Sequence, residues 1–390
     1  MKKSINTLLK QGSKDKVNRS ANPPVVRAST ILFDSMQELI AHEKKVIQNK
    51  KITHYHYGRY GSQTTIELEN IIKDLENAYH VFLTSTGFGA VSLCLMALCK
   101  PGDEILVADN VYEPTRDLAS KILPEFNIVT KYYDPNNFND LKNKITEKTK
   151  LIFVENPGSI TFEFQDLIQI INLAKKRNIL TAIDNTWATA LYFKPLSIGF
   201  DMSITSATKY YSGHSDAMGG TLAVNQKVYK KIKFFNKLMG SRLSADEAYL
   251  IIRGIRTLDV RLKIHYENTV KVINFLKKQK KIKEILYPHK QGSKNYKLWK
   301  KYYSGGTGLF SIVVKSTNKS SVFKFVNKLE LFGIGYSWGG FESLAIYQDI
   351  AKSRHFYKLK KNEHIVRLHI GLEDPKDLIN DLKKSLKNIN

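Results

Sequence analysis

The sequence predicts an α/β fold with a mainly parallel central sheet, followed by a smaller C-terminal α+β domain. Two observations carry this prediction. Short apolar runs alternate with amphipathic helical stretches from about residue 64 to residue 205, which is typical of a parallel sheet covered on both faces. After about residue 256 the alternation stops, and a long helical stretch leads into a second group of strands and helices. A chain of 390 residues has room for two or three such units.

The individual elements follow from the spacing of apolar residues. Residues 1–60 are expected to be irregular apart from one helix at 36–48, and to form an arm. Residues 61–255 should form the α/β domain, with strands at 81–83, 104–108, 128–133, 151–154, 179–183 and 202–205, and helices at 64–78, 87–98, 112–123, 138–146 and 165–177. Residues 256–390 should form the α+β domain, with a helix at 260–280, strands near 308–314 and 365–370, and helices near 320–330 and 375–387.

The composition argues against several classes of protein. The formal charge is +25, but most of the basic residues are lysines spread along the chain, and no helix-turn-helix, zinc-finger or RNA-binding signature is present. No run of 18 apolar residues exists, and the N-terminus lacks the features of a signal peptide. Cys94 and Cys99 lie in an apolar helical run without metal-ligand spacing. We therefore expect free thiols, no metal, no membrane, no specific nucleic acid and a cytoplasmic protein.

The strand ends of the first domain should carry the functional site, because ligands of parallel sheets bind outside the carboxyl ends of the strands. Lys209 lies in a turn of small and hydroxyl residues after the last strand. A partly desolvated lysine there suits Schiff-base chemistry, and the hydroxyls before it suit a phosphate. An ordinary lysine at a strand end is the alternative. The turn at Gly87 begins a helix and offers backbone N–H groups to a phosphate; the alternative is a tight turn without a ligand.

Three further residues have both a functional and a structural interpretation. Asp184 ends an apolar strand, where it could pair with a cationic ring nitrogen or cap the following turn. Tyr112 follows another strand, where it could stack on a flat ring or belong to the core. Arg367 lies on a strand of alternating pattern and could grip a carboxylate or face solvent. Their order along the chain matches the needs of pyridoxal 5′-phosphate (PLP), an electron sink that the protein holds and tunes.

The sequence also resembles the PLP-dependent enzymes of cysteine and methionine metabolism, and within them most closely the bacterial cystathionine β-lyases. The resemblance runs from about Val26 to the C-terminus and rests on ordered motifs. These are residues 57–59 (YGR), 108–114 (ADNVYEP), 155–161 (ENPGSIT), 183–188 (IDNTWA), 206–210 (SATKY), 213–217 (GHSDA), 336–340 (YSWGG) and 367–374 (RLHIGLED). It implies the fold of fold-type I PLP enzymes, which is aspartate aminotransferase-like, and a homotetramer built from two catalytic dimers.

The resemblance implies a role for each matching residue. Lys209 would bind PLP covalently and then act as the acid–base catalyst, with Tyr112 assisting. The implied cofactor-binding residues are Lys209, Asp184, Tyr112, Gly87, Phe88, Ser206 and Thr208, with Tyr57 and Arg59 reaching the neighbouring subunit. The implied substrate-binding residues are Arg367, Ser337, Trp338, Tyr336 and Asn156. Phe88 departs from the family pattern, since a bulky residue stands where small ones are usual.

The implied reaction is α,β-elimination of L-cystathionine to homocysteine, pyruvate and ammonia, with cysteine desulfhydrase as a side activity. Weak alanine racemase activity is a further hypothesis from the chemistry, because a carbanion on PLP can be reprotonated on either face. The core motifs do not separate the α,β-elimination from the reaction of a cystathionine γ-lyase or γ-synthase, although the aromatic residues at 336–338 favour the β-lyase. An alternative of another class is a basic nucleic-acid-binding or regulatory protein built on a PLP fold. The visible absorption of a bound cofactor would discriminate between the two classes.

Overall fold

The computed structural model describes residues 3–10, 19–48, 50, 52–288, 291–351 and 353–390. Its larger sheet has seven strands in the order β1-β7-β6-β5-β4-β2-β3. These strands are β1 (His80–Thr84), β2 (Glu104–Ala108), β3 (Val129–Tyr133), β4 (Thr149–Glu155), β5 (Leu180–Asp184), β6 (Met202–Ser206) and β7 (Gly220–Val224). Strands β2 to β6 pair in parallel, whereas β7 is antiparallel to both β1 and β6. The prediction of a mainly parallel sheet is confirmed.

Helices cover both faces of this sheet, as the side-chain alternation of β1 shows. Successive residues of a strand point to opposite faces. Val81 and Leu83 belong to one core cluster, together with residues of α3 (Gln63–Glu76) and α11 (Ala245–Ile255). Phe82 belongs to another, together with residues of α4 (Gly87–Leu98) and α10 (Gln226–Met239). Burial of both faces explains why the strands read as continuous apolar runs.

Strand β7 was not predicted from the sequence. It follows the turn that carries Lys209 and inserts between β1 and β6. Its first residue, Gly220, comes so close to β1 that a Cβ atom there would lie 2.2 Å from the carbonyl oxygen of Thr86. Only glycine fits this contact, because no side-chain atom can approach a backbone oxygen so closely. The close approach sets β7 beside the turn at Gly87.

The helical stretch predicted at 112–123 is divided into three short pieces. They are α5 (Glu113–Asp117), a π-turn (Leu118–Ile122) and a 3₁₀ turn (Leu123–Phe126). Pro124 lacks the N–H that a continuing α-helix would need. The other connections of the large sheet are α6 (Phe138–Lys144), α7 (Leu167–Lys176), α8 (Thr189–Tyr192) and α9 (Pro195–Ile198).

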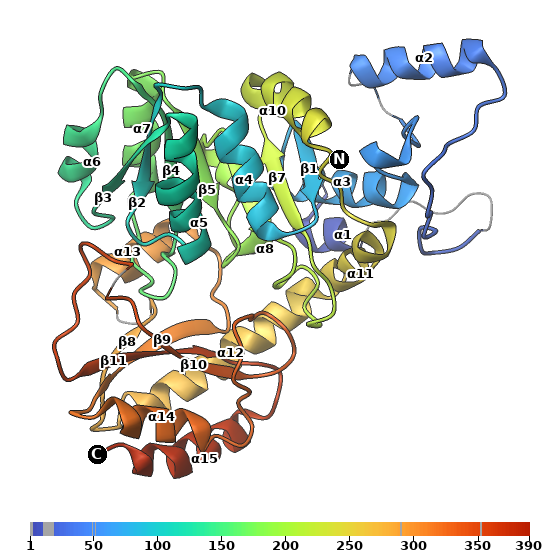
Figure 1. The fold of residues 1–390 in the computed structure, drawn as a ribbon. Coiled ribbons are helices and arrows are strands. Elements are labelled where there is room, and N and C mark those ends of the chain that lie inside the picture. Colours follow the sequence, from blue (N-terminus) through green and yellow to red (C-terminus); the bar gives the residue numbers. More distant parts are fainter. Residues whose placement is uncertain (1–2, 11–18, 49, 51, 289–290, 352) are drawn as a thin grey trace.

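The C-terminal part is built on a second sheet, which lies below the large sheet in Figure 1. The long helix α12 (Leu258–Leu276) leads into it. Its strands are β8 (Ile282–Leu286), β9 (Leu309–Lys315), β10 (Leu344–Gln348) and β11 (Glu363–His369), all paired antiparallel in the order β10-β11-β9-β8. Its helices are α13 (Lys294–Tyr302), α14 (Lys319–Asn327) and α15 (Pro375–Ser385). Of these elements, β8, β10 and α13 were not predicted.

The N-terminal arm contains two helices rather than the single one expected. Helix α1 (Ile5–Leu9) packs beside α3 and α12, and Lys10 forms an ion pair with Asp259 at 2.7 Å. Helix α2 (Met36–Ile47) stands apart from the body of the chain in Figure 1. Among the described residues, no helix is both long and apolar enough to span a membrane.

Candidate active site

Lys209 lies in a compact turn that follows β6. Its N–H donates to the carbonyl of Ser206 (3.1 Å), and its own carbonyl accepts from Gly213 (2.8 Å). Its Nζ donates to Ser337 Oγ at 2.9 Å and lies 5.4 Å from the ring centroid of Trp338. Burial, followed by the charge of Arg367, lowers the pKa of Lys209 to about 8. With that pKa, roughly one amine in ten is neutral at pH 7. The structure therefore favours the reactive amine over an ordinary solvated lysine.

Asp184 is the last residue of β5 and faces the same crevice. Its Oδ1 accepts the N–H of Thr186 at 2.9 Å, and Thr186 Oγ1 accepts the N–H of Ser206, also at 2.9 Å. These bonds join the ends of β5 and β6. Burial raises the pKa of Asp184, and the nearby Lys209 charge opposes that rise. A buried carboxyl without a full counter-charge fits a cationic partner supplied by a ligand.

Tyr112 lies where β2 gives way to α5, and 48% of its surface is exposed. Its N–H donates to Glu155 Oε2 at 2.6 Å. Burial raises the pKa of its phenol, Glu155 and Asp184 raise it further, and Arg367 lowers it. Tyr112 therefore lies within electrostatic reach of Asp184 and Arg367, and its side chain is partly exposed. The core-tyrosine alternative does not fit this exposure.

The turn at Gly87 begins α4 and packs directly on the end of β6. A Cβ atom at Gly87 would lie 2.4 Å from both Cβ and Oγ of Ser206, so the two turns touch. Thr86 caps α4 by accepting the N–H of Gly89 at 2.9 Å. The cap uses the third N–H of the helix, which leaves the N–H groups of Gly87 and Phe88 facing outward for an anion.

The other residues predicted to bind the phosphate lie beside the turn at Gly87. Thr208 is tied to Gly219, since its hydroxyl accepts the Gly219 N–H at 3.1 Å. The Phe88 side chain is partly exposed (38%). A bulky residue is therefore accommodated here without entering the contact between the Gly87 turn and Ser206.

Arg367 reaches the site from β11 and is largely buried. Its Nη2 donates to the carbonyls of Gly335 (3.0 Å), Tyr336 (2.8 Å) and Ser337 (3.0 Å). Burial lowers the pKa of the guanidinium to about 10, which leaves it charged at pH 7. The three contacts all use one nitrogen, so the arginine orders the 335–337 segment while its remaining N–H groups stay available for a carboxylate. A surface arginine on an edge strand is excluded by this burial.

The segment 336–339 closes over the lysine turn. Tyr336 is 84% exposed, whereas the Trp338 ring packs against Tyr210 with the centroids 5.4 Å apart. Gly339 has a φ of +89°, and a Cβ atom there would lie 3.0 Å from Lys209 C and Tyr210 N. This positive φ and tight contact require glycine. The aromatic segment is thereby held against the Lys209 backbone.

Asn156 follows β4 and is fully buried. Its Nδ2 donates to Tyr303 Oη (2.7 Å), and its Oδ1 accepts the N–H of Gln165 (2.7 Å). These bonds fix the side chain in the loop after β4. Its role in substrate binding stays a prediction.

Tyr57 and Arg59 do not join the Lys209 cluster within the same chain. Arg59 donates to the carbonyl of Lys237 at the end of α10 (3.1 Å), and its guanidinium lies 4.8 Å from the Tyr60 ring centroid. Tyr57 is 45% exposed. Both residues lie on the arm side of the molecule.

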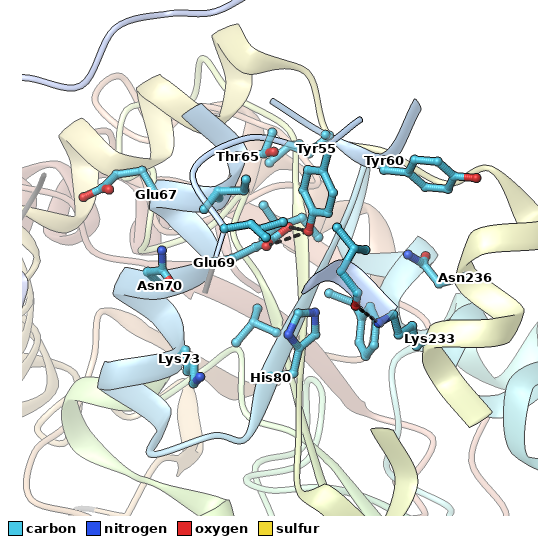
Figure 2. A pocket seen from close by; sticks show the side chains of 18 of the residues that line it. Tyr55, Tyr60, Thr65, Glu67, Glu69, Asn70, Lys73, His80, Lys233 and Asn236 are labelled. Carbon is cyan, nitrogen blue, oxygen red and sulfur yellow. Dashed lines mark hydrogen bonds between the residues drawn. The ribbon is translucent and has the colours of Figure 1, made fainter. Parts of the chain in front are cut away.

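The arm side also holds a cavity of about 1190 Å³ between the arm, α3, β1 and α10. Figure 2 shows Tyr55 and Glu69 meeting at its wall, with the Tyr55 hydroxyl 3.0 and 3.3 Å from the two carboxylate oxygens. Burial raises the pKa of Glu69 to about 8. None of the residues around Lys209 lines this cavity.

Comparison with known proteins identifies the family. A family model described as "Cys/Met metabolism PLP-dependent enzyme" matches residues 6–387. The chain belongs to this family.

Cystathionine β-lyase of Escherichia coli is 36% identical over 98% of this chain and 97% of the E. coli chain. An L-alanine/L-glutamate racemase of Wolbachia pipientis is 34% identical over 98% and 97%. The crystal structure of cystathionine γ-synthase from Xanthomonas oryzae pv. oryzae with cystathionine superimposes with a TM-score of 0.91 and 27% identity, covering 100% and 99% of the two chains.

Membership of this family confirms three predictions: the fold-type I architecture, the PLP cofactor, and the assignment of the chain as a PLP-dependent carbon–sulfur lyase. The residues of this chain fit PLP on structural grounds. The Gly87 turn leaves no room for a side chain against Ser206, Asp184 is a buried carboxyl that lacks a full counter-charge, and Lys209 has a lowered pKa. These three features match a phosphate, a cationic ring nitrogen and an aldehyde, respectively.

Two residues that support the site were not predicted from the sequence. Glu155 accepts the backbone N–H of Tyr112, and Thr186 joins Asp184 to Ser206. Their positions just after β4 and β5 were the available signal, since polar residues at strand ends of a parallel sheet surround the ligand.

Proposed function

We propose that the protein is a cystathionine β-lyase, which splits L-cystathionine by α,β-elimination into homocysteine, pyruvate and ammonia. The observation that carries the proposal is the 36% identity to the E. coli cystathionine β-lyase across nearly the whole of both chains. The matched structure of a γ-synthase is less similar in sequence, at 27% identity. Production of homocysteine would place the enzyme in methionine biosynthesis, and we place that activity in the cytoplasm.

PLP, when bound, supplies the electron sink that stabilises negative charge at the substrate α-carbon. We assign the other tasks to this chain's residues. Arg367 is the cation available for the substrate carboxylate, and the 335–337 segment that it orders would form the adjoining wall with Tyr336, Ser337 and Trp338. Asp184 would keep the ring nitrogen protonated by supplying a buried negative charge.

Proton transfer is assigned to Lys209 and Tyr112. Lys209 Nζ would remove the proton from the α-carbon and deliver it to the departing sulfur. Its hydrogen bond to Ser337 (2.9 Å) holds the amine toward the substrate wall. Tyr112 would stack on the ring and take the proton of the substrate amine. A pKa near 8 suits Lys209 to both halves of this task, because proton transfer is most efficient when the pKa lies near the working pH.

The phosphate would be held by the N–H groups of Gly87 and Phe88 together with Ser206 and Thr208. Tyr57 and Arg59 would reach the phosphate of a second subunit. Their position on the arm side of the chain, away from Lys209, supports this assignment. We infer a catalytic dimer on this ground and propose that two such dimers form a tetramer, whose mass in solution light scattering would measure.

Identification of the keto acid tests the reaction. The purified protein, saturated with PLP, is given L-cystathionine and the product is identified by chromatography. Pyruvate is the expected product, whereas 2-oxobutyrate would overturn the proposal in favour of a γ-lyase. A preparation that shows no visible cofactor band after incubation with PLP would contradict the enzyme as a whole and favour a regulatory role. L-Cysteine in the same assay tests the desulfhydrase side activity.

A second candidate activity is racemisation of alanine or glutamate. The match to the Wolbachia pipientis racemase, at 34% identity over nearly the full length of both chains, favours it. Lys209 and Tyr112 could serve opposite faces of the α-carbon, one removing and the other supplying a proton. Chiral chromatography after incubation with L-alanine or L-glutamate should show the D-enantiomer slowly accumulating. No D-enantiomer above the level in a Lys209→Ala control would exclude this activity.

A further inference from the structure

Glu155 is a partly buried acid beside Asp184 that the mechanism above does not use. It ends β4, as Asp184 ends β5, and the two residues are paired in register. Neighbouring residues of a parallel pair project to the same face of the sheet. The two carboxyl groups therefore lie side by side at the strand ends.

The described hydrogen bond of Glu155 is made to Tyr112. Its Oε2 accepts the Tyr112 N–H at 2.6 Å. Tyr112 has a φ of −51° and a ψ of 137° before the short helix α5, so its N–H is not part of a sheet ladder or a helix. No aromatic ring among the described residues packs on Tyr112, and nearly half of its surface is exposed. The backbone contact with Glu155 is therefore the anchor that directs this ring.

Burial and the Asp184 charge raise the pKa of Glu155, whereas the Tyr112 N–H and the Arg354 charge oppose that rise. The groups that face it are the Asp184 carboxyl, the Tyr112 backbone and the guanidinium of Arg354. Arg354 lies in the C-terminal part, and its N–H groups are donated to the carbonyls of Ser353 and Ser159, both at 3.0 Å. Burial first, and then Asp184, raise the pKa of Glu155 well above its usual value. Two adjacent buried carboxyls do not both ionise readily.

We propose that Glu155 is a positioning residue that acts through Tyr112: its carboxyl group anchors the Tyr112 backbone beside the strand ends and so directs the ring. This inference rests on the role proposed above for Tyr112. It assigns Glu155 no contact with the substrate. The raised pKa of Glu155 agrees with it, since a neutral carboxyl group beside Asp184 leaves the negative charge there to Asp184.

The test compares two substitutions by their affinity for PLP, measured without substrate from the visible band of the reconstituted protein. Glu155→Leu removes the acceptor, so affinity should fall about tenfold, as expected for a lost hydrogen bond to a buried backbone donor. Glu155→Gln keeps an acceptor oxygen and is neutral. Glu155→Gln should restore the PLP affinity to within about threefold of wild type and leave the pH midpoint of the visible band unchanged. Should Glu155→Leu not fold, Glu155→Ala is read in the same way.

Glu76 provides the matched control. It is another buried acid, on α3, and it accepts a hydrogen bond from Ser203 rather than from a site residue. Glu76→Leu should lower the melting temperature without lowering PLP affinity by more than about twofold. An equal loss of affinity in Glu76→Leu and Glu155→Leu would show a general effect of removing a buried acid, and would overturn the proposal.

A double-mutant cycle separates action through Tyr112 from an independent effect. In a Tyr112→Ala background, Glu155→Leu should cost less than about twofold in PLP affinity. Three results would each overturn the proposal. They are a full tenfold loss of PLP affinity in the Tyr112→Ala background, an unchanged PLP affinity in Glu155→Leu alone, and a shift of about one pH unit in the titration of the visible band in Glu155→Gln. The cycle uses no substrate. A wild-type protein that releases no pyruvate would refute the proposed reaction while leaving this coupling measurable.

Discussion

The crevice around Lys209 and the cavity beneath the arm differ in how their charged groups are arranged. The arm cavity has a volume of about 1190 Å³, and its wall carries a partly buried acid, Glu69, whose pKa is raised to about 8. Its described hydrogen bond is to the hydroxyl of Tyr55. At the Lys209 site, by contrast, two cations come from different sheets. Lys209 lies within electrostatic reach of Asp184, and Arg367 lies within electrostatic reach of Tyr112.

The difference shows that volume and a shifted pKa do not by themselves mark a catalytic site. Buried structural groups are also perturbed. What distinguishes the Lys209 site is that charged groups from several strands act on one another's pKa: beyond the effect of burial, Arg367 lowers the pKa of Lys209, and Asp184 raises it. In the arm cavity, burial raises the pKa of Glu69, and the hydrogen bond from Tyr55 opposes that rise. Substitutions in the two regions should therefore have very different effects.

The largest effect is expected for Lys209→Ala. Without the amine, the site loses covalent cofactor attachment and its acid–base group together, so pyruvate release should fall at least about 1,000-fold. The visible cofactor band should disappear as well. Pyruvate assay and absorbance check this, and circular dichroism confirms folding. Activity within tenfold of wild type would remove Lys209 from the mechanism.

Gly87→Ala tests whether the crevice depends on close backbone contact. The added Cβ would meet Ser206 at 2.4 Å, so the turn must shift. PLP affinity should fall about 100-fold, and stability by about 1–3 kcal/mol. Gly89→Ala, whose nearest contact would be 3.3 Å, is the control on the same helix and should lose much less. Equal losses in both variants would point to the helix rather than to the phosphate turn.

Arg367→Lys should raise the KM for cystathionine about tenfold or more with a smaller change in kcat. Lysine keeps the charge but loses the planar fork that grips a carboxylate and orders the 335–337 segment. Steady-state kinetics measure the split. Arg27→Lys is the matched control, since Arg27 is an exposed arginine paired with Asp246. An unchanged KM in Arg367→Lys would argue against the carboxylate role.

The lowered pKa of Lys209 predicts how the apoenzyme captures PLP. The neutral amine is the reactive form, so capture should accelerate as pH rises through about 8. The increase between pH 7 and pH 9 should be about tenfold and then level off, whereas an ordinary lysine would give about 100-fold without levelling. Stopped-flow absorbance follows this step. Capture that still accelerates above pH 10 would show an unperturbed amine.

The smallest effect is expected in the arm cavity. Glu69→Gln keeps an acceptor for the Tyr55 hydroxyl and changes no group near Lys209, so kcat/KM should stay within about twofold.

Glu69 should also make the free energy of unfolding depend on pH, in the direction opposite to that of an acid whose pKa is lowered by folding. Because the folded-state pKa of Glu69 is raised to about 8, its contribution is fully favourable at low pH and declines above the unfolded pKa of about 4.3. Thermal unfolding across this range, compared with Glu69→Gln, measures the decline.

Much of this arrangement could be predicted from the sequence. The apolar runs of β2, β4, β5 and β6 are local signals, and the polar residues that follow them mark the crevice, so Lys209 and Asp184 could be found. Strand β7 could not, because its place depends on the distant contact of Gly220 with Thr86. The same limit applies to the hydrogen bonds of Asn156. Its position after β4 indicates the site, but its side chain turns inward to Tyr303, a partner 147 residues away in sequence.

Gly339 has a consequence for how this enzyme could be altered. Its contact with the backbone of Lys209 and Tyr210 leaves no space for a side chain, so the aromatic segment cannot come closer to the lysine turn. Side chains at 336 and 338 are therefore the positions to exchange in order to redirect bond cleavage. A side chain at 339 would instead push the segment away from the lysine turn, and a change in selectivity would then come with a change at the catalytic lysine.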